Sequence, residues 1–238
     1  MTNDAKPSWT LCCDGDSAVV VTFDNRVDLK VNTHCVVLAE ALRQAVLSGV
    51  RDVVEGYATV TVHHDPRKVT SDTVLEKVRE MVLVVETRYQ LDSVPSGQEI
   101  ALPVCYGGKY GPDIVDVAAF GQCSEADVIR LHSGRNYRVY MLGFQPGFAY
   151  LGSVDGKIAA PRRSEPRVQV PAGSVGIAGK QTGVYPSVSP GGWQIIGRSP
   201  AALCDWTRDP PFLLSPGDHV RFEKIDAATY EDLSSESM

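Results

Sequence analysis

The sequence contains no uninterrupted apolar run long enough to cross a membrane. Its longest apolar runs have about five residues, whereas a helix needs ~20 to span a bilayer. The first residues, MTNDAKPSWTLCC, include no basic segment followed by an apolar core of signal-peptide length. These absences predict a cytoplasmic protein that has no membrane partner.

Cysteine and histidine are sparse and are not spaced as metal ligands. None of the six cysteines forms a C-x-x-C pair, and no histidine lies at ligand spacing from a cysteine. The zinc-protease sequence H-E-x-x-H is also missing. The sequence therefore predicts no metal site, and it favours reduced thiols.

The motifs of common nucleotide-binding and hydrolytic sites are missing too. Neither a P-loop, G-x-x-x-x-G-K-[ST], nor a nucleophile elbow, G-x-S-x-G, occurs. If the protein uses ATP, it does not hold the nucleotide through a P-loop. The formal net charge of −6 argues against a broad basic face, so nucleic acid is not expected as a partner.

The first part of the chain has the patterning of a small α+β domain. With 43% hydrophobic and 22% charged residues, the 238 residues suit one large globular domain or two small ones. The predicted order is β-α-β-β-α-β, one sheet with two helices on a face. Its elements are the strand Ser17–Phe23, a helix from Asn32 to about Ser48, the strands Val50–Val54 and Tyr57–His63, a helix from Thr70 or Ser71, and the strand Ile100–Cys105.

A polar link, Asp92–Gln98, is the predicted boundary between two domains. It divides the chain into residues 1–98 and residues 99–238, although the strand Ile100–Cys105 could belong to either side. His63 and His64 point to opposite faces of a strand end. We therefore expect two exposed histidines there rather than one acid–base or metal site.

The second part is dominated by a stretch rich in glycine and proline, from Tyr140 to Pro200. Of the 21 glycines in the chain, 11 lie between Gly143 and Gly197. Short apolar segments separated by specified turns are typical of a small barrel or sandwich. Helices beginning at Pro112 and Ser124 are expected before this stretch. A closing strand, Asp218–Ile225, and a frayed polar tail from Ala227 are expected after it.

Polar side chains in this stretch suit the binding of an anion or a planar amide. An arginine fork donates hydrogen bonds in pairs to a carboxylate or phosphate, and glycine lets a backbone approach a ligand closely. Alternatively, the glycines serve turns and the arginines are solvated. The side chains are Arg162, Arg163, Arg167, Lys180, Gln181, Thr182, Tyr185 and Arg198.

His132 is the candidate acid or base by residue type. It ends the helix predicted from Ser124, so a charged ring could instead stabilise that helix end by roughly 0.3–1 kcal/mol. Both interpretations stay open on the sequence alone. Tyr185 and Trp193 are interpreted as core or rim aromatics rather than ligand platforms.

Several long motifs occur together in one order. They are PVCYGGKYGPDIVDVA (Pro103–Ala118), GFQPGFAYL (Gly143–Leu151), VPAGSVGIAGKQTGVYP (Val170–Pro186), SPGGWQIIGRSP (Ser189–Pro200) and LLSPGDHVRF (Leu213–Phe222). In these motifs the chain resembles the KipI/PxpB family, also known as allophanate hydrolase subunit 1 or the carboxyltransferase C/D subdomain. The resemblance is close over the last three fifths of the chain and loose before it. Ser199 and Cys204 depart from the usual family residues.

The resemblance implies a fold and an activity. The second domain is expected to be a cyclophilin-like β-barrel. The chain is expected to be one subunit of an ATP-dependent 5-oxoprolinase, which opens 5-oxo-L-proline to L-glutamate, and to be inactive without partners. Those partners would be a KipA/PxpC-like subunit and a separate hydrolase subunit. ATP would be a co-substrate of the complex, with no tightly bound cofactor.

Two alternatives accompany that expectation. One is a KipI-like inhibitor of a sensor histidine kinase, and the other is a subunit of a urea or allophanate amidohydrolase. The expected site is one cleft on the barrel that holds a small anionic lactam or amide. His132 is its expected catalytic residue, also by the family pattern. Its expected substrate-binding residues are Gly143, Phe144, Pro146, Gly147, Phe148, Arg162, Arg167, Gln181, Thr182 and Tyr185.

Overall fold

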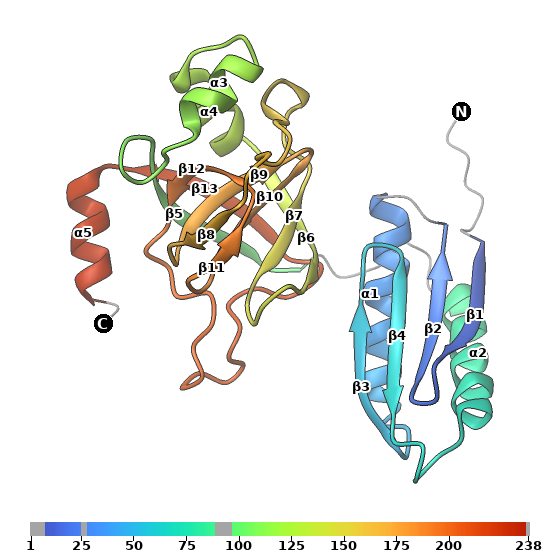
Figure 1. The fold of residues 1–238 in the computed structure, drawn as a ribbon. Coiled ribbons are helices and arrows are strands. Elements are labelled where there is room, and N and C mark those ends of the chain that lie inside the picture. Colours follow the sequence, from blue (N-terminus) through green and yellow to red (C-terminus); the bar gives the residue numbers. More distant parts are fainter. Residues whose placement is uncertain (1–7, 25–27, 89–96, 237–238) are drawn as a thin grey trace. The chain divides into compact units, whose positions relative to one another are not determined.

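The chain forms two compact units, residues 1–96 and 97–238 (Figure 1). Each unit has its own hydrophobic core. The structure, a computed structural model, describes residues 8–24, 28–88 and 97–236. Residues 92–96 of the predicted link lie outside the described residues.

The first unit is an antiparallel sheet with two helices packed on it. Its strands follow the order β1-β2-β4-β3, and valines of β2 and β4 meet the helices in a single core. β4 alternates between the core and solvent, because Val60 and Val62 are buried while His63 is exposed. The elements are β1 (Trp9–Asp14), β2 (Ala18–Phe23), α1 (Leu29–Gln44), β3 (Val50–Glu55), β4 (Thr59–His64) and α2 (Ser71–Arg88).

The predicted order β-α-β-β-α-β is wrong at both ends. An additional strand, β1, pairs with β2 along its whole length. The side chains of β1 are mostly exposed, so it lacks the alternation that identifies a half-buried strand. The last predicted strand is β5 (Glu99–Tyr106), which belongs to the barrel of the second unit.

Two local predictions in the first unit also need correction. Asp28, not Asn32, caps α1, and its side chain accepts hydrogen bonds from the backbone of Lys30 and Val31. Asn32 is buried inside the helix and donates to the carbonyl of Gly56. His64 is not exposed, because only 1% of its surface reaches solvent and Nε2 lies 3.2 Å from Ser71 Oγ.

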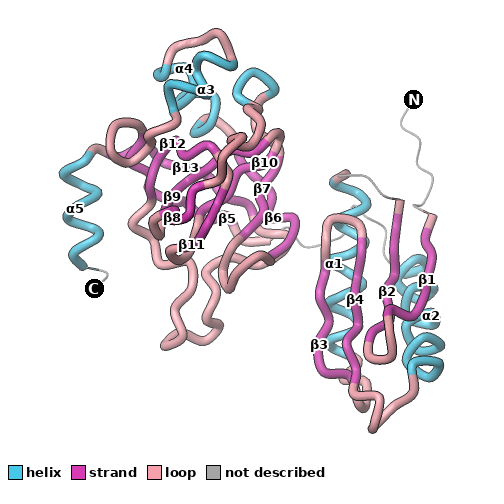
Figure 2. The backbone as a smooth tube through the Cα atoms, in the orientation of Figure 1, coloured by secondary structure: helices cyan, strands magenta, loops and turns pink. Residues whose placement is uncertain are grey.

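The second unit is a closed barrel whose strand order is β10-β7-β6-β13-β5-β12-β9. β13 runs parallel to β5, the first strand, and pairs with it from end to end. Figure 2 places α3 and α4 together at one end of this barrel. The remaining strands are β6 (Asn136–Leu142), β7 (Ala149–Gly152), β9 (Ser174–Ala178), β10 (Gln181–Val184), β12 (Gln194–Arg198) and β13 (His219–Ile225).

The starts of α3 and α4 lie close to their predicted positions, but the prediction for the residues from Ala227 onward is wrong. A capping box of Ser124 and Asp127 begins α4 (Glu125–Ser133), as predicted. Asp113, directly after Pro112, is the N-cap residue of α3 (Ile114–Phe120). The tail expected to be frayed is a helix, α5 (Ala227–Glu236), whose Glu231 accepts hydrogen bonds from Lys109 and Tyr110.

A second cluster of buried side chains is distinct from the core inside the barrel. It gathers Phe148, Val170, Tyr185 and Trp193 with Ala178 and Ile195. Val170 belongs to β8 (Arg167–Val170), which pairs with β11 (Ser189–Gly191) in a separate two-stranded sheet. Since Val175 and Ile177 of β9 belong to the barrel core, Ala178 and its cluster lie on the outer face of that strand.

Candidate functional site

An aromatic cluster lies on this outer face of the barrel. We define it as Phe144, Phe148, Tyr150, Tyr185 and Trp193. Phe148 is its centre, with ring centroids 4.9 Å from Tyr150, 5.3 Å from Tyr185 and 5.4 Å from Trp193, all edge to face. A side chain at Gly183 would lie 3.3 Å from the Trp193 ring, so glycine there lets the rings approach the strand. Phe148, Tyr185 and Trp193 are buried inside the cluster, and Phe144 is its exposed member.

The loop between β6 and β7 presents one member of this cluster to solvent. Phe144 is 61% exposed and has a φ of 66°, a left-handed conformation that a bulky residue adopts at a cost. The loop is held because Phe148 N donates to Gln145 O and Ser187 Oγ donates to Gln145 Oε1. Phe144 is therefore displayed at the edge of the cluster.

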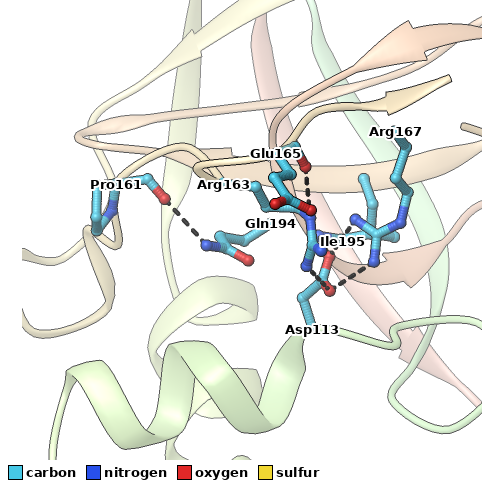
Figure 3. Close-up of polar contacts among 7 residues, drawn as sticks. All are labelled: Asp113, Pro161, Arg163, Glu165, Arg167, Gln194 and Ile195. Atoms are coloured by element: carbon cyan, nitrogen blue, oxygen red, sulfur yellow. Dashed lines mark hydrogen bonds and ion pairs between the residues drawn. The ribbon is translucent and has the colours of Figure 1, made fainter.

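An arginine cluster in the second unit is built on one acid, Asp113 (Figure 3). Asp113 is only 2% exposed. Its Oδ1 accepts from Arg163 Nη1 at 3.0 Å and from Arg167 Nη2 at 2.6 Å, and its Oδ2 accepts from Arg167 Nη1 at 2.8 Å. The backbone N–H of Ile195 donates to Oδ2 at 2.7 Å. One carboxylate thus directs two guanidinium groups.

The arginines act on the phenol of Tyr185. Burial raises the Tyr185 pKa, while a backbone hydrogen bond from Trp193 and the charges of Arg162 and Arg167 lower it. Arg162 and Arg167 therefore lie within electrostatic range of one phenol. Arg162 is exposed and makes no hydrogen bond or ion pair with the described residues. Its guanidinium is available to a ligand, whereas Arg167 is directed by Asp113.

His132 lies elsewhere, inside the barrel. The ring is fully buried, stacks on Phe222 at 4.5 Å, and contacts Tyr106 Oη at 2.8 Å and Thr182 Oγ1 at 2.9 Å. Burial lowers the His132 pKa to about 3, so the ring is neutral at physiological pH. These surroundings favour a structural histidine, and its acid–base role stays a prediction.

The predicted site residues thus divide between two places. His132 and Thr182 meet in the barrel core. Gln181 pairs with Ala178 of the outer cluster, and directly opposite residues point to the same face, so Gln181 faces outward. Of the loop residues, Phe144 and Pro146 are exposed, Gly143 is half-buried, and Gly147 and Phe148 are buried. The outer group comprises Gly143, Phe144, Pro146, Gly147, Phe148, Arg162, Arg167, Gln181 and Tyr185.

Two residues of this region are absent from the predicted ligand site. Asp113 gives no signal beyond its place at a helix start, and its arginine partners follow 50 and 54 residues later. Arg163 stands among the polar side chains of the glycine-rich stretch, but the predicted site includes Arg162 in its place. Only tertiary packing distinguishes these two arginines, because Arg163 is half-buried against Asp113 whereas Arg162 is exposed.

Other kinds of site receive little support from the described residues. Within them, no three histidine, cysteine, aspartate or glutamate side chains gather as metal ligands. No helix among them is long and apolar enough to cross a membrane. A cavity of about 290 Å³ lies in the first unit, and none of the predicted site residues lines it. Its lining is Leu47, Ser48, Lys68, Val69, Thr73, Val74 and Lys77.

Comparison with known proteins gives matches over nearly the whole chain. The family model described as carboxyltransferase domain, subdomain C and D, matches residues 9–214. The B subunit of 5-oxoprolinase from Bacillus subtilis is 39% identical over 94% of this chain and 95% of its own length. The protein of the same name from Escherichia coli O157:H7 is 43% identical over 87% of this chain and 92% of its own.

Solved structures have the same fold. The crystal structure of TTHA0988 has a TM-score of 0.77 and 36% identity over 89% of this chain. This chain spans only 40% of that longer chain. The urea carboxylase of Kluyveromyces lactis also has a TM-score of 0.77, over 99% of this chain and 24% of its own. At 18% identity, that likeness concerns the fold alone.

Proposed function

This chain belongs to the family of carboxyltransferase subdomains C and D, and we propose that it is the B subunit of an ATP-dependent 5-oxoprolinase. The observation that carries the proposal is the 39% and 43% identity to two bacterial 5-oxoprolinase B subunits over nearly their full lengths. The reaction would open the lactam of 5-oxo-L-proline and give L-glutamate. We further propose that the barrel of the second unit is cyclophilin-like.

The substrate-binding face proposed here is the outer face of the barrel. A 5-oxoproline molecule has one carboxylate and one planar lactam. Arg162 and the directed pair Arg163 and Arg167 supply positive charge for the carboxylate. Phe144, exposed at the edge of the aromatic cluster, offers an apolar surface for the ring, and the Gln181 amide suits polar atoms of the lactam. A compact, planar anion is therefore the ligand class that suits this face.

ATP fits the proposed reaction as a co-substrate of the complex. A lactam is a poor substrate for direct hydrolysis, because its nitrogen is a poor leaving group. Transfer of the γ-phosphoryl group of ATP to the lactam oxygen would activate the carbonyl carbon toward water. Since the chain lacks a P-loop, we assign no ATP-binding residue in it.

The expected partners are a KipA/PxpC-like subunit and a separate hydrolase subunit. This chain spans 40% of the longer TTHA0988 chain. That difference in length supports a unit that acts together with additional polypeptide. Large apolar side chains are also exposed in the second unit, as is common for a protein interface. Phe144 is 61% exposed, and Val188 and Trp206 are 54% and 72% exposed.

Reconstitution tests the proposal. The purified chain is assayed alone, with its KipA/PxpC-like subunit, and with both partners, for ATP turnover that depends on 5-oxo-L-proline and for L-glutamate formed. Turnover is expected only in the complete mixture. Strong turnover by the isolated chain would contradict the need for partners. A complete mixture that turns over allophanate or urea, but not 5-oxoproline, would contradict the substrate.

A further inference from the structure

We propose that Asp113 is a positioning residue, which fixes the guanidinium groups of Arg163 and Arg167 so that they meet a substrate carboxylate in one geometry. This inference rests on the proposed function, because it concerns the same face of the barrel. Nothing in the sequence pattern assigns a role to Asp113 beyond the start of α3.

The first support is that Asp113 is itself held rigidly. Its backbone N–H donates to the carbonyl of Ile195 at 2.9 Å, and its Oδ2 accepts from the N–H of Ile195 at 2.7 Å. These two bonds fix the acid to β12 by its main chain and its side chain. The carboxylate therefore has one orientation, which suits an anchor for longer and more flexible side chains.

The second support is the number of contacts that the carboxylate accepts. Four hydrogen bonds reach its two oxygens, three of them from arginine. Arg167 binds in the paired, fork-like geometry, and Arg163 is also held by a 3.4 Å contact from Nε to the carbonyl of Glu165. Arginine side chains lose considerable rotamer freedom when they bind a ligand. Fixing them beforehand removes that cost from binding.

The third support is the balance of charge. Asp113 offers one negative charge to two guanidinium groups, so their cluster keeps one positive charge in excess. Arg162 adds another charge in range of the same Tyr185 phenol. A purely structural ion pair needs only one arginine for each acid. The excess charge, at side chains that are 30% and 26% exposed, suits an anionic ligand.

The decisive variant is Asp113→Glu, which keeps the charge but moves it by one methylene group. In the reconstituted complex we expect the KM for 5-oxo-L-proline to rise about tenfold or more, with kcat within about twofold, the change expected when a charge-assisted hydrogen bond to bound substrate is misplaced. Asp116→Glu is the matched control, since it makes the same change at an exposed position of α3, and its KM should be unchanged. An unchanged KM in a folded Asp113→Glu protein would overturn the proposal.

Two further measurements keep the test independent of turnover and folding. Nuclear magnetic resonance of the Nε–H groups should show that Arg163 and Arg167 are rigid in the wild-type chain and mobile in Asp113→Glu. Equal mobility in both proteins would overturn the positioning role. If Asp113→Glu does not fold, Arg163→Lys is the second variant, because it leaves Asp113 paired with Arg167 and should still raise KM. An unchanged KM there would also overturn it. If the wild-type complex does not turn over 5-oxoproline, the proposed function is contradicted. The mobility of the two Nε–H groups still tests the positioning role in that case.

Discussion

His132 donates a hydrogen bond from Nε2 to Thr182 Oγ1, 2.9 Å away, in the interior of the barrel. The direction follows because Thr182 Oγ1 gives its own proton to the carbonyl of Gly176. The other ring nitrogen, Nδ1, then accepts from Tyr106 Oη at 2.8 Å. His132 therefore links α4 to β10 and β5 as a neutral ring whose two nitrogens are both engaged.

Replacing His132 with alanine should lower the free energy of unfolding by about 2–4 kcal/mol. The change leaves a cavity beside Phe222 and removes the partners of the Tyr106 and Thr182 hydroxyls. Urea unfolding measures the loss, and His63→Ala, at an exposed position of β4, is the control that should change little. Turnover in the reconstituted complex should fall only as far as folded protein is lost. A 10²–10⁴-fold loss from a fully folded variant would establish the acid–base role.

Acid should destabilise the second unit through the same histidine. Its pKa in the folded chain, about 3, lies below the ordinary value of 6.5, so the unfolded chain takes up the proton first as the pH falls. The stabilisation is fully present above pH 6.5 and is lost between about 6.5 and 3, by at most ~1.4 kcal/mol per pH unit. Unfolding free energies of wild type and His132→Ala should converge over this range. Parallel curves would exclude the effect.

Arg162→Ala and Arg167→Ala should separate binding from stability. Arg162 is exposed without a described partner, so its removal should weaken 5-oxoproline binding by roughly 1.5–3 kcal/mol and leave the melting temperature unchanged. Arg167 makes two hydrogen bonds to Asp113, so its removal should lower both affinity and melting temperature. Isothermal titration and thermal unfolding measure the two effects. Normal affinity in both variants would remove the arginines from the site.

Phe144→Gly should impair function with little net change in stability, because the loss of the edge-to-face contacts with Phe148 and Tyr185 offsets the relief of backbone strain. The φ of 66° costs an L-residue about 1 kcal/mol, which glycine does not incur. The exposed ring is lost from the edge of the aromatic cluster, so affinity for 5-oxoproline or for the KipA/PxpC-like subunit should fall. Val168→Gly, at an exposed residue of β8, is a control for the loss of an apolar side chain. An unchanged affinity for both 5-oxoproline and the KipA/PxpC-like subunit would show that Phe144 is dispensable.

The elements that could be predicted are those with one face in a core. β4 and α2 bury residues at regular intervals, and burial imposes a period that is readable in the sequence. β1 could not be read in this way because it is an edge strand with few buried side chains. The helix α5 could not be predicted because its fixed contacts, from Lys109 and Tyr110 to Glu231, come from more than 100 residues away.

The sequence indicated candidate ligand-binding groups by residue type, and their use as one site stays a prediction. Arg167, Tyr185 and Phe144 lie in one region of the second unit. Gln181 and Thr182 are polar neighbours in β10. The alternation of the strand places Thr182 in the barrel core and Gln181 on the outer face. The register of a short strand decides that difference. Asp113 could not be found because an acid at a helix start is ordinary.

The pairing of β5 with β13 has a consequence for the growing polypeptide. Gln98, next to β5, donates to the side chain of Asp218, 120 residues later in the sequence. While the ribosome is still making β13, β5 has an open edge and the barrel cannot close. The sheet of the first unit needs no strand beyond β4 and can be complete long before. The barrel is thus a late and slow folding event, since its closure requires contacts between residues 120 positions apart.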